Sequence, residues 1–246
     1  MRFMLMHKSD PATEAGQLPD QELIGRVGGM IQEMARSGAF LDGAGLRQTA
    51  LGARLDFVGG IRTITRGPYT GDREWTAALA IIKVASLDAA IEWATSLATA
   101  VGDARIDIRP VTEPWDLGMA PKPVDQSFIR YMLLYKADER YEGGAAPARK
   151  ITDAVAALIE AMKAAGVYQT AELLQPGRHS KRVRFTNGKP TVLDGPFTES
   201  KELISGYVLL KLPSIQEAVD WAPTYAAALG DIELDIRPLF ELADLA

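Results

Sequence analysis

The amino-acid sequence predicts an α+β protein made of two tandem ferredoxin-like modules that pack sheet to sheet as a pseudo-symmetric barrel. Two observations predict this fold. When the 246-residue chain is shifted by 128 positions, the distance from Lys8 to Lys136, it matches itself without a gap from end to end. Each copy also contains the same order of segments, which is strand, helix, strand, hairpin, strand, helix and strand.

The repeat defines the domain boundaries. The first module covers residues 1–118, a linker covers residues 119–128, and the second module covers residues 129–246. Three prolines and a glycine between residues 112 and 125 indicate a partly stiff connection. Matched segments include Phe3-Met4-Leu5-Met6 with Tyr131-Met132-Leu133-Leu134, Gly67-Pro68-Tyr69-Thr70 with Gly195-Pro196-Phe197-Thr198, and Asp107-Ile108-Arg109-Pro110 with Asp235-Ile236-Arg237-Pro238.

Each copy begins with a strand, at residues 2–7 in the first copy, and continues with an amphipathic helix. Pro19 and Pro147 are expected at the N1 positions of these helices, where a missing N–H is tolerated. Gly38 and Gly166 end the helices as C′ residues. The apolar residues at helical spacing are Leu23, Val27, Met30, Ile31 and Met34 in the first copy and Ile151, Val155, Leu158, Ile159 and Met162 in the second.

The second part of each copy contains a hairpin, a strand, a helix and a final strand. Their markers are the two-residue turns Gly59-Gly60 and Asn187-Gly188, the apolar runs at residues 78–84 and 207–212, the helix caps Ser86 and Ser214, and the final Arg-Pro pairs at residues 109–110 and 237–238.

This order of elements gives an antiparallel sheet with helices on one face only. The other face must also be covered, and the sheet of the second copy is the obvious cover. We therefore expect the two halves to pack sheet to sheet, with a cleft between the sheets.

Composition excludes several classes of function. The net charge is −5 with scattered basic residues, which argues against nucleic acid as a partner. The chain has no cysteine and two histidines, so disulfides, thiolate chemistry and histidine-rich metal sites are excluded. No apolar run approaches the roughly 20 residues of a membrane helix, and the N-terminus is too short for a signal segment, so a cytoplasmic location is expected. Phosphate-loop and dinucleotide motifs are absent, and we expect no cofactor.

A set of motifs in the second half carries a family resemblance. The central motif is Asp194-Gly195-Pro196-Phe197, and the residues that follow it are Thr198-Glu199-Ser200-Lys201-Glu202. The flanking segments are Glu172-Leu173-Leu174-Gln175-Pro176, Lys181-Arg182-Val183-Arg184-Phe185, Glu217-Ala218-Val219-Asp220-Trp221-Ala222 and Asp235-Ile236-Arg237-Pro238. This set resembles the YCII-related family in its DGPF-motif branch over the whole second half, and the first half resembles it more faintly.

The resemblance implies a fold and suggests two kinds of function. Family members are dimeric α+β barrels, so the tandem chain resembles a fused dimer, which can still form a homodimer. Some relatives resemble small dehydrohalogenases or isomerases that use a His–Asp pair. Others are encoded beside extracytoplasmic-function sigma factors, which implies a regulatory protein partner. One departure matters, because residues 23–34 and 151–162 contain no histidine, whereas the family's enzymes carry theirs on the first helix.

The two copies differ at several polar positions. Glu172 and Tyr207 of the second copy correspond to Ala44 and Leu79 of the first. Either two sites of an ancestral dimer have become one composite site, or one half has drifted while keeping its core.

Three residues are candidate catalytic groups. Asp194 begins a Gly-Pro turn. Its side chain either forms a hydrogen bond with the backbone two residues further along the chain or acts as a partly buried base. His179 lies between Arg178 and Ser180 in a loop, and is either a solvated residue or a functional one, as a proton shuttle or an anion contact. His7 shares a strand face with Phe3 and Leu5 and is expected to point into the inter-sheet space, as a core histidine or as a base.

Five residues are candidate substrate-binding groups. Arg109 and Arg237 end the last strands and could clamp a substrate carboxylate, or pair with Asp107, Asp235 or other acids. Arg66, Tyr207 and Glu172 complete the set, and Arg66 faces Asp194 if the two turns are close.

The leading hypothesis is a small-molecule ligand, an organic acid or a cyclic metabolite, bound in the cleft. As an enzyme the protein would catalyse cofactor-free proton transfer, that is isomerisation, elimination or cyclisation, with Asp194 or His7 as base and Arg66, Arg109 or Arg237 stabilising the anion. The alternative is a non-catalytic ligand-binding or regulatory protein linked to transcriptional control. A structural assembly module is the third reading.

Overall fold

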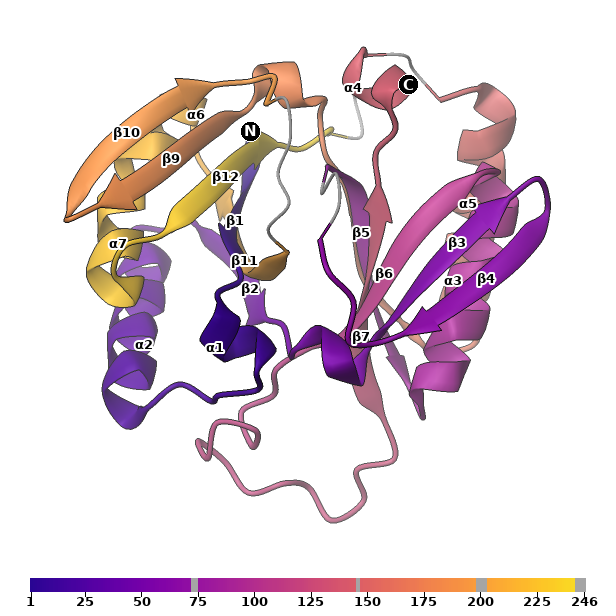
Figure 1. Cartoon of the computed structure of the whole chain (residues 1–246), viewed down its shortest axis with the longest axis horizontal. Helices are drawn as coiled ribbons and strands as arrows, with labels where there is room; N and C mark the ends of the chain where they lie inside the picture. The colour runs from indigo at the N-terminus through magenta and orange to yellow at the C-terminus, as the bar shows by residue number, and fades with distance from the viewer. Residues whose placement is uncertain (72–74, 145–146, 198–202, 242–246) are drawn as a thin grey trace.

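The computed structural model describes residues 1–71, 75–144, 147–197 and 203–241. These residues form two six-stranded antiparallel sheets (Figure 1), which confirms the predicted fold class. The first sheet has the order β10 (Lys189–Asp194), β9 (Lys181–Thr186), β12 (Glu233–Pro238), β1 (Arg2–Lys8), β11 (Ile204–Lys211), β2 (Phe40–Gly45). The second has the order β4 (Ile61–Arg66), β3 (Ala53–Val58), β6 (Ala104–Pro110), β7 (Ile129–Lys136), β5 (Thr76–Val84), β8 (Tyr168–Leu173).

Each sheet combines strands of both copies, which the repeat alone did not predict. In the first sheet β1 lies between β11 and β12 of the second copy. In the second sheet β7 lies between β5 and β6 of the first copy. The strand–helix–strand unit at the start of each copy has therefore been exchanged into the sheet of the other.

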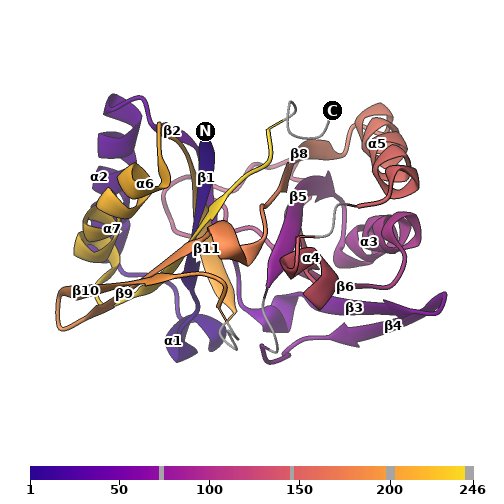
Figure 2. The same cartoon turned by 90° about the horizontal axis from the view of Figure 1, so that it is seen from above.

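Helices cover the outer face of each sheet (Figure 2). On the first sheet lie α2 (Gln21–Arg36), α6 (Ile215–Asp220) and α7 (Ala222–Leu229), and on the second lie α3 (Leu87–Val101) and α5 (Arg149–Ala164). Asp20 is the N-cap of α2 and Ala148 is the N-cap of α5, so Pro19 and Pro147 precede the caps and are not the predicted N1 residues. Gly38 and Gly166 follow the helices with positive φ, as predicted. No helix in the described ranges is long and apolar enough to cross a membrane.

The inner faces of the central strands pack against each other. Met4 and Met6 of β1 and Tyr207 of β11 contact Met132 and Leu134 of β7 in one buried cluster. Phe3 and Leu5 instead point to the helix side of the first sheet. The central strands are apolar on both faces, and the buried side chains of this cluster fill the space between them, where a cleft was predicted.

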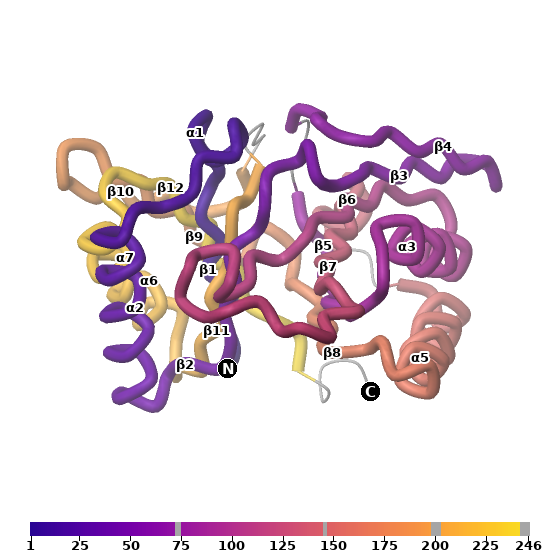
Figure 3. The backbone as a smooth tube through the Cα atoms, turned by 90° about the horizontal axis from the view of Figure 1, so that it is seen from below, coloured from indigo at the N-terminus to yellow at the C-terminus, as the bar shows by residue number. Residues whose placement is uncertain are grey.

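Short helices and the linker close the ends of the sandwich. At one end lie α1 (Pro11–Glu14) and η1 (Thr49–Leu51), and Figure 3 shows the linker crossing this end. At the other end lie α4 (Glu139–Glu142) and η2 (Gly177–His179).

Candidate functional site

A buried triad of charges joins the two copies in the first sheet. Lys8 Nζ lies 2.6 Å from Asp235 Oδ2, and Arg182 donates to both oxygens of Asp235 at 2.6 and 3.0 Å. Burial alone would raise the pKa of the Asp235 carboxyl, but the Lys8 ammonium and the Arg182 guanidinium hold it below its usual value. The lysine comes from the first copy and its two partners come from the second.

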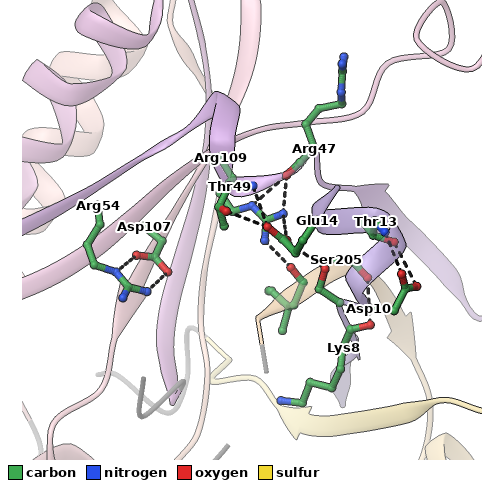
Figure 4. A network of polar contacts seen from close by, with 12 residues as sticks. Lys8, Asp10, Thr13, Glu14, Arg47, Thr49, Arg54, Asp107, Arg109 and Ser205 are labelled. Carbon is green, nitrogen blue, oxygen red and sulfur yellow. Dashed lines mark hydrogen bonds and ion pairs between the residues drawn. The ribbon is translucent and has the colours of Figure 1, made fainter. Parts of the chain in front are cut away.

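The pseudo-equivalent triad lies in the second sheet, and Figure 4 shows its Arg54–Asp107 pair. Arg54 donates to Asp107 at 2.6 and 2.9 Å, and Lys136 Nζ lies 3.2 Å from Asp107. Both triads could have been identified from the sequence, because the same lysine, arginine and aspartate occupy matching positions of the two copies.

The aromatic residues of the repeated Gly-Pro motif stack on these triads. The Phe197 ring lies 4.3 Å from the Arg182 guanidinium carbon, and the Tyr69 ring lies 4.5 Å from that of Arg54. The motif glycine is required by close backbone approach, because a Cβ on Gly195 would lie 1.9 Å from the carbonyl oxygen of Gly177. Within the described residues, the glycine and the aromatic residue of the motif therefore have a structural role, in close packing and in stacking on the triads.

Asp194 does not match either of its predicted roles. Its side chain is 77% exposed and pairs with Lys181, so the partial burial expected of a base is absent. The predicted hydrogen bond from the backbone N–H two residues after Asp194 is wrong, because that residue is Pro196, which has no N–H. Arg66 pairs with Asp88 on the exposed side of α3 and does not face Asp194.

The two histidines occupy different environments. His179 is exposed in η2, where its Nε2 accepts a hydrogen bond of 3.0 Å from Arg178. His7 shares a face with Phe3 and Leu5 as predicted, but this face packs under the helices and not into the inter-sheet space, with the Tyr225 ring 6.1 Å away. Burial lowers the pKa of His7 to about 4, and its Nδ1 has no hydrogen-bond partner in the described residues.

Arg109 and Arg237 are engaged within the protein. Arg109 donates to Glu14 at 3.1 Å, to the Ile204 carbonyl at 2.7 Å and to the Arg47 carbonyl (Figure 4). Arg237 donates to Glu142 at 3.1 Å and to the Gln175 carbonyl at 2.6 Å. Both side chains are buried, so they tie the last strands to the short helices and do not present a clamp to a substrate.

Tyr207 and Glu172 lie in one inter-sheet polar cluster. Tyr207 donates a 2.5 Å hydrogen bond to Asp42, and Arg2 Nη1 lies 2.7 Å from Glu172. Burial raises the pKa of Tyr207, and the hydrogen bond to Asp42 raises it further. Arg130 also belongs to this cluster, and its pKa is raised mainly by its hydrogen bonds to Glu113. The structure therefore brings together two of the five predicted binding residues, at positions where the copies differ.

A pocket of about 270 Å³ lies where the linker meets η1 and the ends of β6 and β7. Arg47 contributes its guanidinium, with Nη1 2.7 Å from Asp116, whereas its buried Nε has no acceptor among the described residues. The lining residues are Arg47, Leu51, Pro110, Val111, Glu113, Trp115, Asp116, Lys122, Gln126, Ile129 and Tyr131. This pocket was not predicted from the sequence, in which residues 119–128 have the pattern of a connection only.

Comparison with curated proteins finds a relative that matches part of the chain. An uncharacterised protein (R00369) of Rhizobium meliloti (strain 1021) is 34% identical over 67 residues, which is 27% of this chain. The aligned part spans 54%, about half, of the length of that relative. No solved structure matches the chain.

The family model of the YCII-related domain matches residues 1–113 and again residues 129–233. The two matches coincide with the two copies of the repeat, and together they cover most of the chain. The chain therefore belongs to the YCII-related domain family and carries two tandem copies of the domain.

Proposed function

We propose that the protein binds a small organic acid in the pocket between η1 and the linker. One observation carries the proposal. The wall of the pocket contains Arg47, whose side chain is 27% exposed and pairs with one carboxylate, that of Asp116, and a guanidinium has N–H donors for a second.

The other pocket residues suit the same class of ligand. Lys122 is exposed at the rim and supplies a second positive charge for a carboxylate. Leu51, Ile129 and Trp115 offer apolar surface to the body of the ligand. A few polar groups above an apolar wall are typical of small-molecule sites.

Ligand binding is better supported than cofactor-free proton transfer. None of the predicted bases, Asp194, His179 and His7, lines the pocket. The two carboxylates that do line it are each held by an arginine, Glu113 by Arg130 at 2.8 Å and Asp116 by Arg47. A binding or regulatory role therefore agrees better with this geometry than the enzyme hypothesis does.

The test is a thermal-shift screen of the purified protein with small carboxylates, lactones, phenols and halogenated rings. A ligand of the native state raises the melting temperature with concentration. We expect carboxylates to be the hits, and Lys122→Glu to weaken their binding about tenfold, or ~1.4 kcal/mol. Proton NMR of the mixture then shows whether the acid is only bound or also consumed.

The matched control is Lys150→Glu, the same charge reversal at an exposed position on α5. It should bind carboxylates like the wild type. Equal loss of binding in both variants would indicate a general charge effect, and a screen in which carboxylates fail to bind would refute the proposal.

A further inference from the structure

We infer that Asp116 is an internal competitor for the proposed ligand, because its carboxylate occupies part of the Arg47 guanidinium in the unliganded chain. This inference rests on the proposed function and concerns regulation of the same pocket. Asp116 belongs to the segment that leads into the linker, so the connection between the copies would control access to the site.

The contacts of Asp116 place it against the cation of the pocket. Its Oδ1 lies 2.7 Å from Arg47 Nη1, and its Oδ2 accepts a 3.0 Å hydrogen bond from the Glu113 N–H. The side chains of Arg47 and Asp116 are 27% and 20% exposed. Both are therefore partly screened from water, and the charge of Asp116 acts strongly on any anion that approaches Arg47.

Other arginines of this chain show what Arg47 lacks. Arg54, Arg130 and Arg182 each hold a carboxylate through Nε and Nη2 together. Such paired contacts are the preferred way for a guanidinium to bind a carboxylate. Asp116 instead has its closest contact at Nη1, and the buried Nε has no acceptor among the described residues.

A ligand carboxylate would bind at the exposed part of the Arg47 side chain, because the Nε is buried. It would then share one guanidinium with Asp116, and two negative charges at such a distance repel each other. Binding therefore favours a shift of Asp116 away from Arg47, and the linker segment moves with it. Removal of the Asp116 charge should remove this competition and strengthen binding of an acid.

Trp115 provides a direct optical signal. It lines the pocket and precedes Asp116, in a turn in which the Asp116 N–H donates to the Glu113 carbonyl at 2.9 Å. A shift of Asp116 changes the surroundings of the indole. Binding of an acid should therefore change the tryptophan emission of the wild type, and Trp115→Phe should abolish that change.

The experiment measures the Kd of benzoate, with benzamide as the uncharged analogue, by isothermal titration calorimetry. The proteins are the wild type, Asp116→Asn and the matched control Asp125→Asn, which removes the same charge from an exposed position of the same linker. Asparagine keeps an oxygen that can accept from the Glu113 N–H. We expect Asp116→Asn to bind benzoate about tenfold more tightly than the wild type does. Asp125→Asn should leave the Kd of benzoate unchanged, and neither substitution should change the Kd of benzamide.

The outcomes separate this inference from the proposed function. If the wild type binds benzoate and Asp116→Asn binds no more tightly, or if Asp125→Asn gains as much, the inference is refuted and the proposed function stands. The inference is also refuted if binding leaves the emission of Trp115 unchanged. If no protein of the set binds benzoate or any other carboxylate of the thermal-shift screen, both proposals fail together.

Discussion

Buried polar side chains of this protein differ in how completely their hydrogen bonds are satisfied. Arg109 is fully buried, and it donates to a carboxylate and to two backbone carbonyls. The Nδ1 of His7 is out of contact with solvent and has no partner in the part of the chain that the structure describes. A buried group of this second kind lowers stability, because its hydration is lost without replacement.

The first prediction concerns the pH dependence caused by His7. Its pKa of about 4 lies below the ordinary value of 6.5, because burial disfavours the imidazolium, although Asp10 favours it. Between pH 6.5 and 4 the unfolded chain binds a proton that the native state does not, so stability falls as the pH falls. His7→Leu should flatten this slope, and at pH 5 it should remove a penalty of at most about 2 kcal/mol.

Urea unfolding at pH 7.5 and at pH 5 measures this effect. His179→Gln is the control, because it removes the other histidine of the chain from an exposed position. It should leave the pH dependence as it is in the wild type. An equal slope in the wild type and in His7→Leu would show that His7 is not the titrating group.

His7 also shows how far a single residue can be predicted from sequence. Strand alternation correctly placed it with Phe3 and Leu5. The alternation does not say what covers that face, because Met4 and Met6 on the other face are equally apolar. Only the arrangement of the sheets shows that the helices lie over His7.

At the scale of elements, local patterns predicted most of the fold. Asn187 and Gly188 have the positive φ of the predicted hairpin turn, and Ser86 and Ser214 cap their helices. These features depend on neighbours in sequence, so sequence is sufficient to find them. The pocket depends on η1, two strand ends and the linker coming together, and no local sequence pattern marks such a meeting of distant segments.

The second prediction concerns the glycine of the Gly-Pro motif. Gly195→Ala should destabilise the protein by about 3 kcal/mol, because the new Cβ would lie 1.9 Å from a backbone oxygen that cannot rotate away. Gly25→Ala is the matched control on the exposed side of α2, where no atom lies within 4 Å of the new Cβ. It should stabilise the helix by up to about 1 kcal/mol. Thermal unfolding of both variants checks this contrast, and equal melting temperatures would contradict it.

At the scale of the whole molecule, the exchange of strands is the feature that sequence could not predict. The two copies carry matching strands, so β1 pairs equally well in principle with the strands of its own copy or of the other. The structure selects the other copy for both β1 and β7. Lys8 and Lys136 then complete triads whose aspartate and arginine belong to the opposite copy.

The last prediction follows from this exchange. A protease site inserted between Met119 and Ala120, two exposed residues of the linker, allows the chain to be cut after folding. The two fragments should stay together in native buffer, because β1 and β7 are each hydrogen-bonded on both sides within a sheet of the other copy, and the buried triads lose their lysines if the copies separate.

Size-exclusion chromatography before and after cleavage measures this association, and the uncut insertion variant is the control. We expect one peak at the mass of the intact protein, which divides only in denaturant. Each isolated half would expose the edges of a central strand and the apolar inner face of its sheet, which includes Met4 and Met6 in one half and Met132 and Leu134 in the other. Two separate folded fragments after cleavage would mean that each copy can form its own sheet, and the exchanged arrangement would then be a property of the fused chain alone.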